Sequence, residues 1–330
     1  MVNLETSYLG LTLKNPLVAA SSGLTGSVEK IVSLEKAGIG AVVLKSLFEE
    51  QINNEVTSLL LQDYHNIGYP EAEDYIKNYL RDNSVTKHIK LIEESKKAVS
   101  IPVIASVNCV SASEWTSFAK VFQEAGADAL ELNIFYVPVD RREEPHVIEQ
   151  LYADVLKKVC SQISIPVSVK IGLYHSNILS MVDKLKAYGA NGVVMFNRFY
   201  EPDIDIDKLE MISSEIFSSP VEIRHTLRWV GLVSATVPEI DIAASTGIHD
   251  GKAVIKQLLA GASVAQLCSS LYINGNIIVS QMLSEITEFM KRWNFTKISD
   301  FQGRVSYNKV TDPMIYERSQ FMKYFSNRGR

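Results

Sequence analysis

Residues 184–197 read KLKAYGANGVVMFN, in which a helical segment ends at a glycine and a β-branched run follows at once. A glycine just after the last turn is a common helix stop, and a short run that is apolar on both faces is typical of a buried parallel strand. The same junction occurs twice more, at 36–41 and 124–129. The repeat therefore predicts a chain built from alternating helices and strands.

Short apolar runs that fit buried strands occur eight times along the chain. They cover residues 16–21, 41–45, 102–107, 129–134, 167–171, 192–197, 241–246 and 263–269. Amphipathic segments lie between many of them, at 27–37, 85–99, 111–125, 147–163, 177–188 and 251–259. Eight units close a (β/α)8 barrel, whereas a doubly wound sheet usually has fewer strands and a GxGxxG turn, which this chain lacks. We therefore predict an α/β fold of the (β/α)8, or TIM barrel, type.

Three segments lie outside this minimal barrel. We expect residues 3–14 to form an N-terminal hairpin that closes the bottom of the barrel. The segments 46–84 and 198–220 are predicted to be long loops after strands two and six, on the face where barrel loops carry function. The whole of 1–330 is predicted to be one domain, with 293–330 as a C-terminal extension.

Composition excludes several classes of protein. The 330 residues carry 33 Lys and Arg against 38 Asp and Glu, a net charge of −5, and 46% of them are hydrophobic. This balance is typical of a folded protein and argues against a disordered chain or a nucleic-acid binder. The basic extension over 293–330 is interpreted as a solvated tail or a subunit contact.

Cysteine spacing and hydropathy exclude further classes. The three cysteines, Cys109, Cys160 and Cys268, are far apart and form no CxxC pair, and no histidine spacing fits a metal site. No stretch approaches the roughly 18 apolar residues of a spanning helix, and no basic and apolar leader is present. We expect a cytoplasmic protein with neither a metal nor a membrane contact.

The ends of the predicted strands are the place to look for chemistry, because a barrel carries its active site there. Lys45 and Lys170 lie at the ends of strands two and five. Lys170 is interpreted as a Schiff-base lysine, a surface lysine, or a cation that faces an electron-rich ring. Asn108, Asn133 and Asn197 end three other strands and could bind a flat heterocycle through planar hydrogen bonds.

The last two strands end in small residues, at 245–248 and 268–270. Without bulky side chains, backbone N–H groups can converge on an anion, so we predict that these two stretches form a phosphate site. A flavin with a phosphate tail would satisfy both the planar and the anionic requirements.

At this point the sequence resembles the dihydroorotate dehydrogenase family of FMN enzymes. The resemblance runs over nearly the whole chain and rests on the order and spacing of short motifs. These are Asn15-Pro16 before Ala20-Ser21, Leu44-Lys45-Ser46, Asn66-Ile67-Gly68-Tyr69-Pro70, Glu131-Leu132-Asn133, Val169-Lys170, Asn197, Thr246-Gly247 and Asp300-Phe301-Gln302-Gly303. The resemblance implies an FMN-binding barrel that acts in pyrimidine biosynthesis on dihydroorotate or a related ring or enone.

The resemblance also implies roles for individual residues. The cofactor-binding residues would be Ala20, Ser21, Lys45, Ser46, Asn108, Asn133, Lys170, Asn197, Thr246, Gly247, Cys268 and Ser269. The substrate-binding residues would be Lys45, His65, Asn66, Asn133 and Asn197. Lys170 would face the pyrimidine edge of the flavin and stabilise its reduced anion, and Lys45 would supply charge for a substrate carboxylate.

The chain departs from the family in the strand-seven loop, where Ser245-Thr246 replaces the family's glycine-rich pair before Gly247, and at the position of the base. The family has a cysteine or serine base three residues after the asparagine of strand four, in a stretch like Asn-x-x-Cys-Pro-Asn. This chain has Tyr136 there, and the second asparagine is missing. A phenol with a pKa of about 10 is mostly protonated at neutral pH, so we expect Tyr136, with Lys45, to be catalytic as a proton donor in the reducing direction. Cys109 is interpreted as a residue that packs at the strand end, with the role of an alternative base as the less favoured interpretation.

Two other functions remain open on the sequence. The chain could be a flavin-binding electron-transfer or regulatory partner that has lost dihydroorotate oxidation, which the change at Tyr136 favours. It could also be a barrel lyase that uses Lys170 or Lys45 as a Schiff base. If the chain acts like the family that it resembles, we expect a homodimer with a small-molecule substrate. We also expect an electron-transfer subunit, which would carry any iron–sulfur centre.

Overall fold

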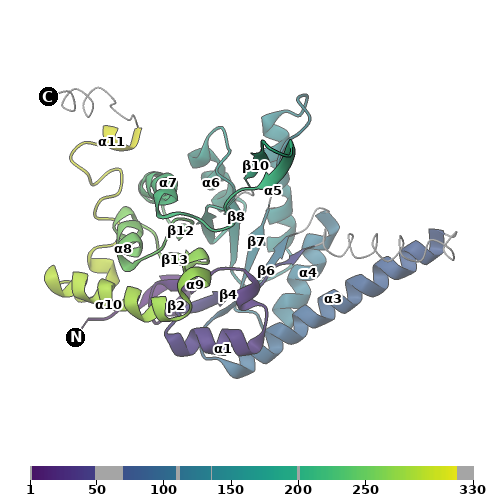
Figure 1. Ribbon diagram of the computed structural model, residues 1–330, viewed down its shortest axis with the longest axis horizontal. Helices are drawn as coiled ribbons and strands as arrows, with labels where there is room; N and C mark the ends of the chain where they lie inside the picture. Colours follow the sequence, from purple (N-terminus) through teal and green to yellow (C-terminus); the bar gives the residue numbers. More distant parts are fainter. Residues whose placement is uncertain (1, 49–69, 109–111, 135, 199–200, 318–330) are drawn as a thin grey trace.

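Eight parallel strands form a closed barrel in the computed structural model, which describes residues 2–48, 70–108, 112–134, 136–198 and 201–317 (Figure 1). The strands are β3 (Leu17–Ala19), β4 (Ala41–Val43), β6 (Val103–Asn108), β7 (Ala129–Asn133), β8 (Val167–Ile171), β9 (Gly192–Met195), β12 (Asp241–Ser245) and β13 (Val264–Leu267). Each pairs with the next in parallel, β13 pairs with β3, and the two-residue β5 (Leu47–Phe48) adds to the end of β6. The predicted (β/α)8 barrel is confirmed.

Helices surround the barrel (Figure 1). They are α1 (Val28–Ala37), α3 (Pro70–Ala98), α4 (Ala112–Glu124), α5 (Pro145–Cys160), α6 (Ile178–Ala187), α7 (Ile223–Thr236), α8 (Gly251–Ala260) and α10 (Ile277–Arg292). Short helical turns are η1 (Gly23–Thr25), η2 (Pro220–Glu222), α9 (Ser269–Asn274), η3 (Ile298–Asp300) and α11 (Met314–Glu317). The sequence patterns did not predict α7 and α10. In the described part of the chain, no helix combines the length and apolarity that crossing a bilayer requires.

An N-terminal hairpin closes the bottom of the barrel. β1 (Thr6–Tyr8) and β2 (Leu11–Leu13) pair antiparallel, and Tyr8 and Leu9 pack against the apolar residues inside the barrel. A side chain on Gly192 would come within 2.6 Å of Leu9, so glycine at this position makes room for the plug. Asp241 holds the plug in place, because its carboxylate accepts a hydrogen bond from the backbone N–H of Leu9 at 2.7 Å.

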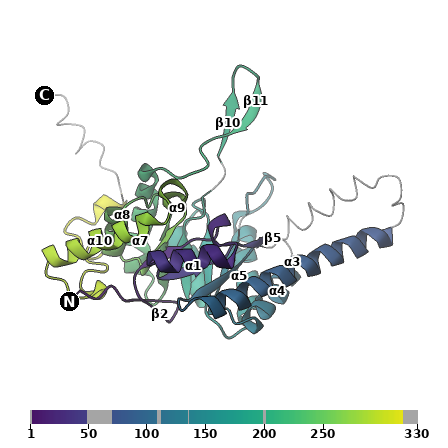
Figure 2. The same ribbon diagram turned by 60° about the horizontal axis from the view of Figure 1, so that its bottom comes forward.

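A second hairpin interrupts the segment that follows β9. β10 (Pro202–Asp205) and β11 (Glu210–Ser213) pair antiparallel and project away from the barrel (Figure 2). The segment after β4 contains β5 and the start of α3, while residues 49–69 between them lie outside the described part.

The described part of the C-terminal extension follows the outside of the barrel. The backbone N–H groups of Gly303 and Val305 donate to carbonyls of α8, and that of Tyr307 donates to Gly231 of α7. The division into one domain with an extension stays a prediction.

A buried histidine on α3 makes the stability of the fold sensitive to acid. His88 is 7% exposed, its ring lies 4.7 Å from that of Phe122, and its Nε2 has no hydrogen-bond partner among the described residues. Burial lowers the pKa of His88 to about 4. The folded protein therefore keeps His88 neutral while the unfolded chain, with a histidine pKa of about 6.5, takes up a proton.

This shift predicts that stability is lost as the pH falls from about 6.5 toward 4. Between pH 7.5 and 4.5 we expect His88 to account for a loss of roughly 2 to 3 kcal/mol in the free energy of unfolding. Urea unfolding of a His88→Leu variant at the two pH values should show a smaller loss than the wild type. The exposed His225, changed to leucine, is the matched control. An unchanged pH dependence in His88→Leu would contradict the assignment.

Candidate active site

A cavity of about 440 Å³ opens at the C-terminal ends of the barrel strands. This volume is within the range of small-molecule sites. Its lining includes eight residues that the sequence predicted, which are Ala20, Ser21, Lys170, Asn197, Thr246, Gly247, Cys268 and Ser269. Residues far apart in the sequence thus meet at the mouth of the barrel.

The turn after β12 forms one end of the cavity. Thr246 and Gly247 both have positive φ angles, of 79° and 77°. A Cβ on Gly247 would lie 2.2 Å from the backbone nitrogen of Ile223, so only glycine fits where this turn meets the start of α7. Such a turn brings backbone close to a ligand without side chains in the way, which suits a phosphate group.

Hydroxyl groups converge on the same end. The backbone N–H of Ser218 donates to Ser269 Oγ at 2.9 Å, and that of Gly247 donates to Ser218 Oγ at 3.4 Å. Ser218 Oγ is also 3.2 Å from Nε2 of His249. Three separate loops are therefore joined at the place where the sequence predicts a phosphate.

A chain of serine hydroxyls lies at the ends of neighbouring strands. Ser21 Oγ is 2.9 Å from Ser46 Oγ, which is 2.7 Å from Ser106 Oγ. The backbone N–H of Ser46 also donates to Ser21 Oγ at 2.9 Å. These bonds fix the ends of β3, β4 and β6 relative to one another and give this side of the site small polar groups.

The buried Lys170 also lines the cavity, together with Asn197, and Asn133 adjoins both of them without lining it. Lys170 is 8% exposed and Asn133 is 9% exposed, and they are paired residues of β8 and β7. Asn197 donates through Nδ2 to Asn133 Oδ1 at 2.9 Å. Among the described residues, no carboxylate lies within ion-pair distance of Lys170. A cation in such a place can stabilise negative charge that develops on a bound ligand.

Two predicted residues lie at the rim. Lys45 is exposed, and its side chain passes Gly26, where a Cβ would lie 3.4 Å from Lys45 Cδ. Asn108 is half-buried at the end of β6. Neither lines the cavity as the described residues define it. His65, Asn66 and Cys109 lie outside the described residues.

Tyr136 also lies outside the cavity lining. Its ring is 38% exposed, and its hydroxyl donates to Oε1 of Glu143 at 2.5 Å. The hydrogen bond and the negative charge of Glu143 raise the pKa of Tyr136, so the phenol stays protonated at neutral pH. The structure therefore places at this position a protonated phenol that is hydrogen-bonded to a neighbouring carboxylate.

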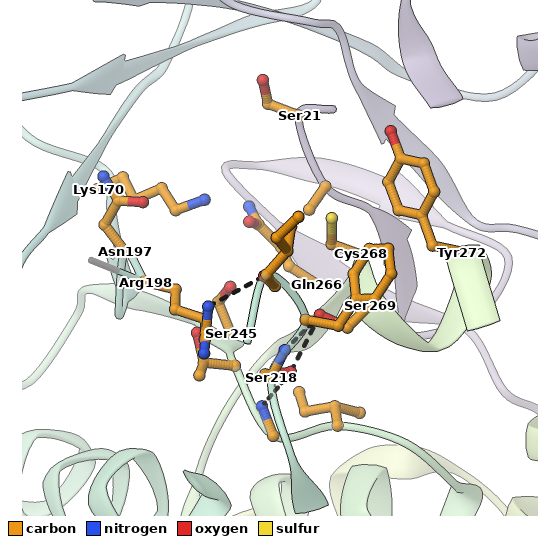
Figure 3. Close-up of a pocket in the computed structure, with 16 residues that line it drawn as sticks. Ser21, Lys170, Asn197, Arg198, Ser218, Ser245, Gln266, Cys268, Ser269 and Tyr272 are labelled. Atoms are coloured by element: carbon orange, nitrogen blue, oxygen red, sulfur yellow. Dashed lines mark hydrogen bonds between the residues drawn. The ribbon is translucent and has the colours of Figure 1, made fainter. Parts of the chain in front are cut away.

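The cavity contains residues that the sequence patterns missed. Gln266 lies inside the barrel on β13, and Arg198 directly follows Asn197. Arg198 is held by Glu222 Oε2 at 3.1 Å and by the carbonyl of Ile216 at 2.9 Å. Figure 3 shows the ammonium of Lys170 and the amide of Gln266 pointing toward each other. The sequence offered one sign of Gln266, because it is a single polar residue within an otherwise apolar strand.

The arrangement fits a flat, polar heterocycle that carries a phosphate. One end has a tight glycine turn and hydroxyls, and the other has a buried ammonium with amides. A flavin mononucleotide combines these two parts. Within the described ranges, no cluster of three or more His, Cys, Asp or Glu side chains is placed to hold a metal ion.

Comparison with known proteins gives a consistent result. The family model described as "Dihydroorotate dehydrogenase" matches residues 3–290. The chain is 27% identical to "Dihydroorotate dehydrogenase B (NAD(+)), catalytic subunit" of Thermoplasma acidophilum, over 92% of this chain and 99% of that protein. It is 24% identical to "Putative dihydroorotate dehydrogenase A (fumarate)" of Aeropyrum pernix, over 91% of this chain and 96% of that protein. The matches span the barrel and all of its strands.

Proposed function

Because the chain belongs to the dihydroorotate dehydrogenase family, whose members are oxidoreductases that act on CH–CH bonds, we propose that it is an FMN-dependent enzyme of this type. Its substrate is dihydroorotate, which would place it in pyrimidine biosynthesis, or a related ring or enone. The observation that carries the proposal is the buried Lys170 in a cavity whose other end is the Thr246–Gly247 turn.

The predicted cofactor-binding residues divide between the two parts of FMN. Thr246, Gly247, Cys268 and Ser269 would hold the phosphate. The residues that would hold the ring are Ala20, Ser21, Ser46, Asn108, Asn133, Lys170 and Asn197. When bound, FMN supplies the chemistry of hydride transfer. Lys170 supplies a fixed positive charge, which favours the reduced, anionic state of the ring.

The substrate would lie at the mouth, against Asn133 and Asn197. The hydrogen bond between these amides fixes their orientation, so that the remaining donors and acceptors are already aligned. The exposed Lys45 supplies charge for a carboxylate, and His65 or Asn66 would complete the contacts. Tyr136 would deliver a proton in the reducing direction, after its hydroxyl leaves Glu143.

A Tyr136→Phe variant tests the proton donor. We expect reductive turnover to fall by about 100-fold, the lower end of the contribution of a general acid, while FMN remains bound. Because the pKa of Tyr136 is raised, the wild-type rate should stay independent of this group through neutral pH and fall only at alkaline pH. Tyr174→Phe, at an exposed tyrosine near the end of β8, is the matched control. Unchanged turnover in Tyr136→Phe contradicts the role.

One observation favours a second candidate function. The hydroxyl of Tyr136 is engaged by Glu143 rather than turned into the cavity. A flavin-binding electron-transfer or regulatory partner that has lost dihydroorotate oxidation would retain the cavity without a base. Normal FMN binding without reduction by dihydroorotate supports this candidate.

The partners are also proposals. The relative from Thermoplasma acidophilum is named a catalytic subunit, and we propose by analogy that a second subunit takes electrons from this chain. We also propose that two copies pair through the projecting β10–β11 hairpin, whose Ile204, Leu209 and Met211 are more than half exposed. Exposed apolar patches of this kind mark interaction surfaces. Sedimentation of the purified chain as a dimer supports the pairing, and sedimentation as a monomer contradicts it.

A further inference from the structure

A buried carboxyl group lies inside the barrel on the strand that carries Asn133. Glu131 is 1% exposed, and its Oε2 accepts a hydrogen bond from Nε2 of Gln266 at 2.7 Å. β7 and β13, which carry the two residues, are opposite each other in the closed ring of eight strands. The hydrogen bond therefore spans the interior of the barrel, and its Gln266 end lines the cavity.

Lys170 lies on the strand next to the one that carries this carboxyl group, and its charge acts on Glu131. Glu131 pairs in register with Ser168, and Lys170 lies two residues further along the same strand, on the same face. Burial raises the pKa of Glu131 above its usual value, while the charge of Lys170 and the hydrogen bond from Gln266 act in the opposite direction and favour the ionised form. Burial and the charge of Glu131 raise the pKa of Tyr8, which belongs to the N-terminal plug.

The polar groups around Glu131 are incompletely paired. Glu131 Oε1, Gln266 Oε1 and Ser168 Oγ have no hydrogen-bond partner among the described residues. A buried carboxyl group that is not fully hydrogen-bonded lowers the stability of the folded protein. The presence of Glu131 near Lys170 therefore indicates a role other than stabilising the fold. Neutral residues would pack this layer at lower cost.

We propose that Glu131 is a positioning residue that acts through Lys170 and Gln266: it partly offsets the charge of Lys170 and thereby lowers the reduction potential of the bound flavin. This inference rests on the proposed function. Reduction adds negative charge to the ring, and the cation of Lys170 stabilises that charge. A carboxylate just below Lys170 weakens the stabilisation, because charges in a poorly solvated site act over several ångströms.

The test measures the midpoint potential of FMN bound to the folded protein at pH 7, by equilibration with a reference dye. In Glu131→Gln, we expect the equilibrium to shift about tenfold toward the reduced flavin, which corresponds to about +30 mV for a two-electron couple. Ser168→Ala, in the same buried layer, changes no charge and should leave the potential as in the wild type. Glu131→Asp keeps the charge and should also remain near the wild-type value.

Any other result contradicts either the proposed function or the role of Glu131, as follows. If no variant and no wild-type protein binds FMN, the proposed function fails. If FMN binds and Glu131→Gln keeps the wild-type potential, only the role of Glu131 fails. A shift in Glu131→Asp as large as that in Glu131→Gln shows that shape and not charge matters. Glu131→Met is a second neutral variant, and if neither neutral variant folds while Glu131→Asp does, Glu131 is structural and the proposal is overturned.

Discussion

Replacement of Lys170 by methionine is expected to slow reduction of the bound flavin by substrate about 100- to 1,000-fold, the usual cost of removing one preorganised group that stabilises developing charge. Lys170 is 8% exposed and lines the cavity, so its charge is poorly screened by water. Methionine has a similar length and keeps the packing. The loss should therefore come from the missing charge.

Rapid-mixing absorbance under anaerobic conditions measures this rate directly. Lys184→Met is the matched control, because Lys184 is a surface lysine paired with Glu149 on the outside of the barrel. The variant at Lys170 should still bind oxidised FMN, since the phosphate end of the cavity is unchanged. A rate within a factor of about three of the wild type, with FMN bound, would show that Lys170 is not the cation that stabilises the reduced ring.

Replacement of Gly247 by alanine is expected to remove most of the affinity for FMN, by about 100-fold or more. The added Cβ would lie 2.2 Å from the nitrogen and 2.7 Å from the Cα of Ile223, and backbone atoms cannot rotate away. The φ angle of 77° adds strain of about 1 to 2 kcal/mol. The turn must therefore move, and with it the N–H groups that would face the phosphate.

Gly10→Ala separates the clash from the strain. Gly10 has a similar φ of 72°, and nothing lies within 4 Å of an added Cβ. Both variants should lose stability in urea unfolding, whereas only Gly247→Ala should lose affinity in a titration of FMN fluorescence. Equal FMN affinity in the two variants would mean that the Thr246–Gly247 turn does not hold the phosphate.

The barrel could be predicted because its signals are local. Each buried strand is a short run of mostly apolar residues, and several strands follow a glycine that ends the preceding helix, so neither feature depends on distant contacts. The helix α7 and the hairpin of β10 and β11 were missed, since both lie within or next to the long segment after β9. That segment does not contain the junction of a helix end, a glycine and a strand that is repeated elsewhere in the chain.

The site was predicted in part for a similar reason. A residue that ends a parallel barrel strand must lie at the mouth, which brought Lys170, Asn197 and Gly247 together. The direction of a side chain on a loop has no such constraint. Two contacts depend on loop conformations that sequence spacing does not determine. They are the hydrogen bond of Tyr136 with Glu143 and that of Ser218 with Ser269.

The measurement that tests the central claim most directly is an anaerobic visible spectrum of the purified protein, recorded before and after addition of dihydroorotate. We predict an FMN absorbance band that bleaches as the substrate is oxidised. A band that persists would keep the cofactor site and contradict dihydroorotate as the substrate, in favour of the second candidate. No band after reconstitution with FMN would contradict the account as a whole.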